Sequence, residues 1–324
     1  MRRPWISLLC LALIVALIGG SLVGCQRNEA TERRIVCTSF AAYDWVRAIL
    51  GNTDTLEPVL LVSDGSDLHS YQPTVADKVT LAEGALVVRV GGESDRWVAE
   101  LAEDTRILCL SELDGITLRE AEILGGAGHS EAHVHAEDEH GEAHSHAGFD
   151  EHLWLSLRNA SVCVAALCEL LCDLDAEQAD LYRQNAAAYL SELGALDAAL
   201  VAMTEAAPRR EVLVADRFPF VYLVEEYGIA YCAAFSGCST EAQASFETVV
   251  RLAKQADEWA LSHLLVTESG DRRLAASVIA ASERQGMTVL ALDSMQAVSA
   301  ARATRITYLS VMQENLEILR VVLS

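Results

Sequence analysis

The chain has 324 residues, of which 52% are hydrophobic, and its formal net charge at pH 7 is −23. A chain of this length can bury a full core in one large domain or in two lobes. So acidic a composition argues against nucleic-acid binding, which needs basic patches facing the phosphates. It favours a soluble surface that weakly attracts cations.

The N-terminus has the pattern of an export signal. Arg2 and Arg3 precede the apolar run "ISLLCLALIVALIGG", which is followed by "LVGC" ending at Cys25. A basic start, an apolar centre and small residues before a cleavage point are typical of a secretory signal, and the apolar run is short for a spanning helix. Since "LVGC" looks like a bacterial lipobox, we predict a signal peptide over residues 1–24, a lipidated Cys25, a tether over 25–33 and an extracytoplasmic domain. The alternative is a membrane-spanning anchor with an incidental cysteine.

Strands and helices alternate from residue 34 onward. The expected strands are 34–40, 55–62, 85–92 and 106–113, and the expected helices are 41–50, 73–84 and about 94–102. This alternation predicts a parallel sheet with helices on both faces. We assign residues 34–175 to an N-terminal lobe built on this sheet.

A His-rich acidic stretch over residues 128–148 interrupts the alternation. Its histidines are His129, His133, His135, His140, His144 and His146. The stretch has no apolar periodicity, so we expect a mobile loop. A tract of this composition indicates metal binding only in general terms. We interpret it as an auxiliary, low-affinity metal collector, with a solvated insert as the alternative.

A second α/β lobe follows a long helix. The Ala- and Leu-rich segment after the loop has helical periodicity and a break near 173–175, which leaves a connecting helix over 176–207, roughly 45 Å long. In the C-terminal lobe, 208–324, the expected strands are 211–216, 229–235, 263–269 and 287–294, and the expected helices are 218–227, 245–261, 271–285 and 302–322. One rigid connector predicts small movements between the lobes.

Candidate ligands lie at the carboxyl ends of strands, where open parallel sheets bind their ligands. His69 follows the strand 55–62, and His152 stands in an apolar context just after the His-rich loop. Asp216, Glu268 and Asp293 each end a strand of the second lobe. Imidazoles together with carboxylates suit Zn²⁺ or Mn²⁺.

Other potential ligands have simpler interpretations. His263 begins its strand, roughly 16 Å from Glu268, so we read it as structural. Seven cysteines remain after the signal and Cys25, so at least one is unpaired. Cys168 and Cys172 have the i, i+4 spacing of a helical metal pair, but small core residues are the favoured reading.

Several segments together resemble a known family. The segment "DGSDLHSYQPTVADKVTLAEGALVVRVGGESDRWV" resembles the first metal-ligand segment of the zinc- and manganese-binding proteins of ABC importers. "FDEHLWLSLRNA" resembles their second segment, "VLVADRFPFVYLVEEYGI" the third, and "LLVTES" and "VLALDSMQ" the last two strand ends. The resemblance spans nearly the whole mature chain and implies two α/β lobes, one long connecting helix and a metal ion in the cleft between the lobes.

The resemblance also implies a ligand set. His69 and His152 would be ligands from the first lobe, Asp216 would replace the usual third histidine, and Asp293 would be the second-lobe carboxylate. Glu268 would be a ligand or a partner that orients one. Two carboxylates resemble the manganese members, but many zinc-type members have a His-rich loop before the second ligand. We therefore expect zinc, with manganese as the alternative.

Three functions remain open from the sequence. The resemblance implies a monomeric binding protein that delivers the ion to an ABC importer permease, with no nucleic-acid partner. A secreted zinc metallohydrolase with Glu268 as general base is the second reading, although the sequence contains no HExxH motif. The third is a zinc buffer in which the His-rich loop is the main site.

Overall fold

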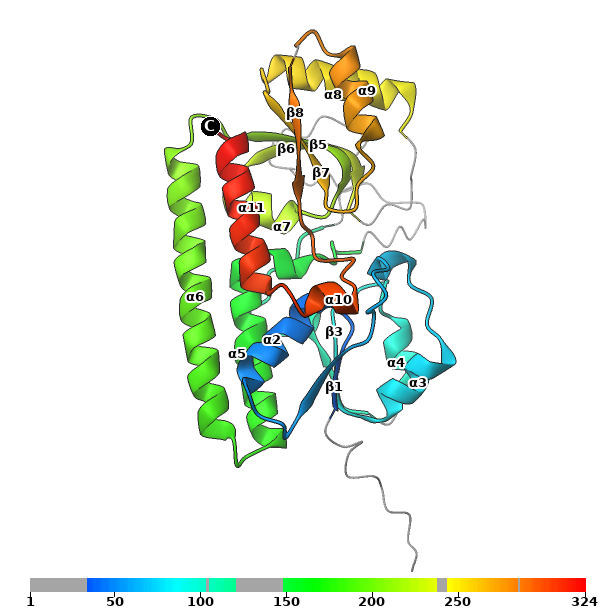
Figure 1. Cartoon of the computed structure of the whole chain (residues 1–324), viewed down its shortest axis with the longest axis vertical. Helices are drawn as coiled ribbons and strands as arrows, with labels where there is room; N and C mark the ends of the chain where they lie inside the picture. The colour runs from blue at the N-terminus through cyan, green and yellow to red at the C-terminus, as the bar shows by residue number, and fades with distance from the viewer. Residues whose placement is uncertain (1–33, 103–104, 121–147, 238–243, 285) are drawn as a thin grey trace, which may run out of the picture.

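The computed structural model describes residues 34–102, 105–120, 148–237, 244–284 and 286–324 (Figure 1). The predicted signal peptide, Cys25 and the six loop histidines from His129 to His146 lie outside the described residues. The described chain forms two parallel four-stranded sheets flanked by helices. The predicted fold class is therefore confirmed.

The first lobe is built on a sheet with the strand order β2-β1-β3-β4. Its strands are β1 (Arg34–Cys37), β2 (Glu57–Leu60), β3 (Gly84–Arg89) and β4 (Ile107–Cys109), and its helices are α2 (Phe40–Leu50), α3 (Val75–Ala82) and α4 (Trp97–Leu101). The central strands are continuous apolar runs because both faces of the sheet are covered. Ser39 caps α2 and Thr74 caps α3, so α2 begins directly after β1 and α3 begins after the segment that carries His69.

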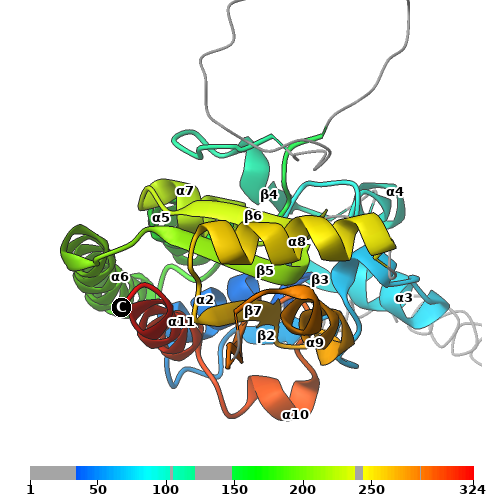
Figure 2. The ribbon, with the colours of Figure 1, turned by 90° about the horizontal axis from the view of Figure 1, so that it is seen from above.

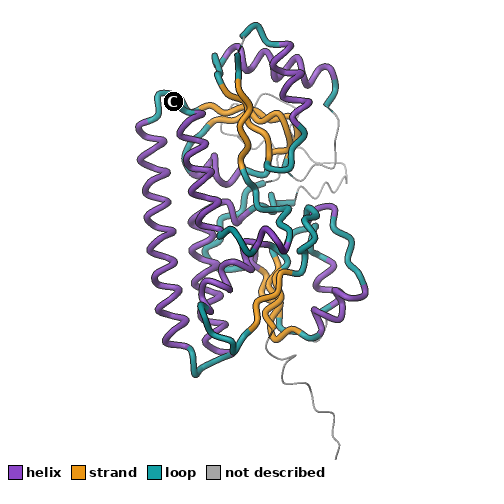
Figure 3. Tube along the Cα trace, viewed as in Figure 1, coloured by secondary structure: helices purple, strands orange, loops and turns teal. Residues whose placement is uncertain are grey.

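The second lobe repeats this arrangement with the order β6-β5-β7-β8. Its strands are β5 (Glu211–Phe218), β6 (Ala230–Ser236), β7 (His263–Thr267) and β8 (Thr288–Leu292), and its helices are α7 (Val221–Glu226), α8 (Phe246–Glu258) and α9 (Arg272–Ala281). All strand pairs are parallel. Loops and short helices lie between the two groups of strands (Figure 3). The loops that follow the strands of both lobes therefore meet in one central region.

Three long helices form a column along one side of both sheets (Figures 1 and 2). They are α5 (Leu157–Leu174), α6 (Ala179–Ala206) and α11 (Tyr308–Val322). The helix α6 has 28 residues, which makes it roughly 42 Å long. It packs against α2, α5 and α11 and is the predicted long connection between the lobes.

The chain also returns to the first lobe after β8. The short helix α10 (Ala300–Ala303) follows this crossing, and its first N–H donates to the Ser63 carbonyl at 2.7 Å. The Arg47 guanidinium of α2 donates to the Ala303 carbonyl at 2.8 Å. Part of the segment 208–324 thus packs on the N-terminal lobe. The division into 34–175, 176–207 and 208–324 stays a prediction.

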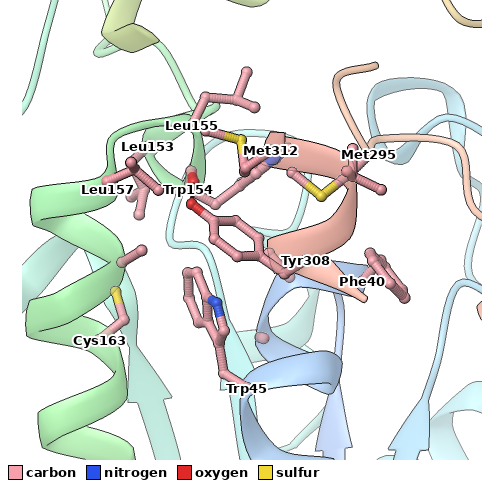
Figure 4. Close-up of a cluster of buried hydrophobic side chains, with 14 of the residues drawn as sticks. Phe40, Trp45, Leu153, Trp154, Leu155, Leu157, Cys163, Met295, Tyr308 and Met312 are labelled. Atoms are coloured by element: carbon pink, nitrogen blue, oxygen red, sulfur yellow. Dashed lines mark hydrogen bonds between the residues drawn. The ribbon is translucent and has the colours of Figure 1, made fainter. Parts of the chain in front are cut away.

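A buried aromatic cluster joins the lobes where the 3₁₀ turn η4 (Leu153–Leu155) meets α2 and α11 (Figure 4). The rings of Trp45 and Tyr308 meet edge to face at 5.2 Å. The Tyr308 hydroxyl donates to the Trp154 carbonyl at 2.6 Å, and the Trp154 indole donates to the Ser294 carbonyl at 2.8 Å. The polar atoms of Trp154 and Tyr308 are thereby paired, as burial requires, whereas the Trp45 indole nitrogen has no hydrogen-bond partner among the described residues.

The described cysteines are all free thiols. They are Cys37, Cys109, Cys163, Cys168, Cys172 and Cys232. Cys168 and Cys172 are each 5% exposed and belong to the main hydrophobic core, in agreement with the core reading of this pair. Burial raises the pKa of the Cys163 thiol to about 12, so this thiol stays protonated and unreactive at neutral pH.

Replacing Asp44 by Ala is expected to lower the free energy of unfolding by about 1–3 kcal/mol. The Asp44 carboxylate is buried, accepts a hydrogen bond from the Tyr308 N–H at 2.7 Å and pairs with Arg47. Its loss leaves a buried N–H and a guanidinium without this partner. Urea unfolding followed by circular dichroism measures the effect.

The matched control for this change is Asp180→Ala. Asp180 is fully exposed and pairs with Arg183 one turn along the same helix, and such surface pairs contribute little to stability. We expect the control to unfold at the wild-type urea concentration. Equal stability of the two variants would contradict the role given to Asp44.

Candidate metal site

Two histidine rings meet at the centre of the molecule. The Nε2 atoms of His69 and His152 lie 3.1 Å apart, and the ring centroids lie 5.0 Å apart. His152 is completely buried, and the His69 side chain is 11% exposed. The structure therefore brings together the two histidines that the sequence selected, with their metal-binding atoms facing each other.

The His152 ring is held from behind by Asp150. One oxygen of this carboxylate lies 2.9 Å from both the backbone nitrogen and Nδ1 of His152. The Tyr222 hydroxyl of the second lobe donates to the Asp150 carbonyl at 2.6 Å, which fixes this segment from the other side. A carboxylate behind an imidazole fixes the tautomer and makes the opposite nitrogen a better ligand.

His69 is placed by the short turn η2 (Leu68–Ser70). The Asp67 side chain caps this turn and accepts a hydrogen bond from the His69 N–H at 3.0 Å. Glu151 lies behind the ring, with Oε2 3.8 Å from His69 Nδ1. The Glu151 carboxylate accepts hydrogen bonds from the backbone N–H groups of Glu93 and Ser94. The loop after β3 thus holds Glu151 in place beside His69.

The two rings have opposite electrostatic environments. Burial lowers the pKa of His69, and the neighbouring His152 lowers it further. Burial also lowers the pKa of His152, but the charge and hydrogen bond of Asp150 outweigh this effect, and the net pKa is raised. His152 therefore holds a proton more tightly than His69, and a metal ion at this pair competes with that proton.

The second lobe contributes Gln296 to the same place. Its side-chain oxygen Oε1 lies 2.8 Å from His152 Nε2, and the residue is 6% exposed. Gln296, Asp150 and Glu151 were not predicted as site residues from the sequence. Their positions could have indicated them, because Asp150 and Glu151 directly precede His152 and Gln296 stands three residues after Asp293.

The predicted carboxylate Asp216 lies within β5 and has local partners. Its Oδ2 accepts hydrogen bonds from the Thr267 N–H at 3.0 Å and from the Thr267 hydroxyl at 2.6 Å. Its Oδ1 accepts one from the Arg217 N–H at 2.8 Å. No described contact joins Asp216 to either histidine.

Glu268 and Asp293, at the ends of β7 and β8, also have local partners. Glu268 accepts hydrogen bonds at 2.9 Å from the N–H and the hydroxyl of Ser294. Asp293 pairs with the Arg302 guanidinium and accepts the Met295 N–H at 2.9 Å. Among the described residues, no group of three or more His, Cys, Asp or Glu side chains is arranged to hold a metal ion. The ligand set stays a prediction.

One further contact connects the site across the lobes. The Arg217 guanidinium lies 2.9 Å from Asp67 Oδ2, which connects the turn that carries His69 to β5.

His263 stands at the first position of β7, where its Nδ1 lies 3.0 Å from the Ser262 hydroxyl oxygen. This is the strand-start position that the sequence indicated for a structural histidine.

Comparison with known proteins decides the family. The sequence model described as "ZnuA: Zinc-uptake complex component A periplasmic" matches residues 35–322. The chain belongs to this family. The resemblance found in the sequence is therefore confirmed, and the match covers both lobes and the helix between them.

Relatives in the ZnuA family show the same extent of similarity. The zinc-binding lipoprotein AdcA of Streptococcus pneumoniae serotype 4 is 26% identical over 314 residues, which are 95% of this chain and 60% of that protein. This chain thus spans about three-fifths of the length of that curated relative. A putative metal-binding protein of Chlamydia muridarum is 23% identical over 284 residues, 87% of this chain and 92% of that protein.

Solved structures show that the fold is shared. The periplasmic zinc-binding protein TroA from Treponema pallidum has a TM-score of 0.70 at 22% identity, with 90% of this chain and 99% of that chain covered. At these identities the likeness establishes the two-lobed ZnuA-type fold and leaves the ligands of this chain to its own residues.

Replacing Glu268 by Gln is expected to remove a pH dependence of stability. Burial and the nearby Asp293 raise the pKa of Glu268 to about 7. The folded protein holds this proton more tightly than the unfolded chain, so the stabilisation is present below the unfolded pKa and is lost as the pH rises through about 7. Between about pH 5 and pH 8, the unfolding free energy of metal-free protein should fall by on the order of 2 kcal/mol more in wild type than in Glu268→Gln.

The control for this measurement is Glu314→Gln, because Glu314 is exposed on α11. The control should follow the wild-type pH curve. Parallel curves for wild type and Glu268→Gln would show that Glu268 ionises normally in the folded protein.

Proposed function

We propose that this chain captures a divalent metal ion between its lobes and delivers it to the permease of an ABC importer. Zinc is the favoured ion and manganese the alternative. The supporting observation is the buried pair of His69 and His152, whose Nε2 atoms face each other at 3.1 Å. Imidazole nitrogens are preferred ligands of zinc, and Asp150 and Glu151 supply the negative charge behind the rings.

Binding through the predicted carboxylates requires an exchange of partners. We propose Asp216 and Asp293 as ligands and Glu268 as a ligand or an orienting partner. An ion bound by Asp293 must displace the Arg302 guanidinium, and one bound by Asp216 must compete with Thr267. Two imidazoles favour zinc, whereas hard carboxylate ligands in the set would shift the preference toward manganese.

The relatives support the choice of ions. The Streptococcus pneumoniae relative is named a zinc-binding lipoprotein. A manganese-bound mutant of a periplasmic metal-binding protein from Candidatus Liberibacter asiaticus has a TM-score of 0.71 at 18% identity, with 90% of this chain and 100% of that chain covered. Both ions are therefore found in proteins of this fold.

We propose that the protein works as a monomer at the outer face of a membrane. The predicted signal over residues 1–24 and the lipobox-like "LVGC" support a lipid on Cys25. The name of the pneumococcal relative as a lipoprotein supports this location. The contacts between the lobes made by Trp154 and by Arg217, together with α6, support small lobe movements during capture and release.

A transport role is favoured over hydrolysis. Both Glu268 oxygens accept hydrogen bonds from Ser294, so the candidate general base is occupied by a neighbour. Turnover of an ester, peptide or phosphate that is abolished in a Glu268→Ala variant would support the metallohydrolase instead.

Deleting residues 129–146 tests whether the His-rich loop or the histidine pair is the tight site. We expect the shortened protein to keep one tight equivalent of zinc and to lose only weaker equivalents, because the buried pair has a supporting scaffold. Isothermal titration with chelator competition and elemental mass spectrometry measure the two classes of site. Loss of the tight equivalent would identify the loop as the main site.

Replacing His69 by Ala in the full chain is expected to lower the affinity of the tight zinc by at least about 100-fold, since the change removes a ligand rather than a supporting partner. The matched control is His263→Ala, because His263 stands at the opposite end of a strand from the proposed ligands. The control should bind zinc as wild type does. Equal affinity of the two variants would contradict the proposed function.

A further inference from the structure

We infer that Gln296 is a metal ligand supplied by the second lobe, with its side-chain amide oxygen beside the Nε2 atom of His152, which also faces Nε2 of His69. This inference rests on the proposed function and deepens it, because it adds a residue outside the predicted ligand set. The observations that carry it are the placement of Gln296, the lone pairs that meet at His152 Nε2 and the two distances from that atom to His69 Nε2 and Gln296 Oε1.

The backbone directs Gln296 toward the first lobe. Met295 has a φ of 60°, a left-handed conformation that non-glycine residues rarely adopt and that is often found where a side chain must be aimed. Its N–H is held by Asp293, and Trp154 holds the Ser294 carbonyl. The turn before Gln296 is therefore anchored in both lobes.

The β8 side of this turn is also held rigidly. The Asn315 side chain of α11 accepts the Asp293 N–H at 2.9 Å and donates to the Asp293 carbonyl at 2.8 Å. Gln296 itself lines a buried cavity of about 10 Å³ together with Thr38 and Ser39, which has room for about one water molecule. Its amide group is therefore buried, with Oε1 beside His152 and Nε2 without a hydrogen-bond partner among the described residues.

The hydrogen-bonding atoms around His152 are predominantly acceptors. Because His152 Nδ1 donates to the Asp150 carboxylate, Nε2 of the neutral ring carries a lone pair. Gln296 Oε1, which has lone pairs only, lies 2.8 Å from this nitrogen, and His69 Nε2 lies 3.1 Å from it. One proton can satisfy one such contact, whereas a divalent cation can be bound by all three atoms.

The distances fit a metal shell. Bonds of about 2.0–2.1 Å in a tetrahedral site place neighbouring ligand atoms roughly 3.3 Å apart. The two observed separations from His152 Nε2, 3.1 Å and 2.8 Å, are slightly shorter. A small outward movement of the two partners accommodates an ion.

The carboxylates of the second lobe are less available than Gln296. Asp293 is neutralised by Arg302, and Asp216 accepts two hydrogen bonds from Thr267. The amide and the two imidazoles are neutral, so the charge of the ion is balanced by Asp150 and Glu151 behind the imidazoles and by the proposed carboxylate ligands once they exchange partners. A carboxylate at position 296 should therefore strengthen binding.

The test is zinc affinity of the full chain, measured at about pH 8 by competition with a chromophoric chelator strong enough to leave weak loop sites empty. Gln296→Ala is expected to bind zinc at least about 10-fold more weakly than wild type. Gln296→Glu should bind as tightly as wild type or more tightly. Gln313→Ala, at an exposed position of α11, is the control and should leave affinity unchanged.

A second readout follows the ligand directly. Zinc K-edge absorption should show two imidazoles and a further oxygen ligand in wild type, with the oxygen shell altered in Gln296→Ala. Melting curves of the chelator-treated proteins check that each variant folds. A folded Gln296→Glu protein keeps the test decisive if Gln296→Ala does not fold.

Three outcomes would separate the inference from the proposed function. Tighter zinc binding by Gln296→Ala would show that the amide nitrogen faces His152 and blocks the site, and would overturn the inference. Unchanged affinity in a folded Gln296→Ala protein, together with the expected loss in His69→Ala, would overturn the inference alone. Wild-type affinity in His69→Ala would overturn the proposed function itself.

Discussion

Trp154 connects the two lobes through hydrogen bonds on opposite sides of one residue. Its indole N–H donates to Ser294 in the loop after β8, and its carbonyl accepts from the Tyr308 hydroxyl at the start of α11. Because His152 lies two residues earlier in the same turn, these bonds set the position of the imidazole relative to the second lobe. The buried ring of Trp154 also excludes water, which strengthens each polar contact in the region.

The site is surrounded by carboxylates that already have cationic or hydrogen-bonding partners. Arg302 pairs with Asp293, and Arg217 pairs with Asp67 beside the turn that carries His69. Such charge-assisted contacts are stronger than neutral hydrogen bonds. A captured ion therefore gains affinity only where it replaces a partner at little cost, and the histidine pair meets that condition better than the paired carboxylates.

Both lobes use the same strand order, so the second sheet repeats the arrangement of the first. Each sheet directs the ends of its strands to the central region. At the second crossing, the Ala300 N–H donates to the Ser63 carbonyl and the Arg47 guanidinium donates to the Ala303 carbonyl. With two connections and a shared aromatic cluster, the lobes form a stiff frame around a small site.

The sequence by itself determined the order of strands and helices, the two-lobed class and the pair His69 and His152. These follow from local patterns: apolar periodicity marks each element, and a histidine after a buried strand stands at the ligand-binding edge of a parallel sheet. The tertiary structure alone decided which partners Asp216, Glu268 and Asp293 take. It also decided that Gln296 contacts His152, although the two residues are 144 positions apart in the sequence. The reason is physical, because a carboxylate or an amide at a strand end looks the same in sequence whether it binds an ion, an arginine or a neighbouring hydroxyl, and only the packing of distant segments selects among them.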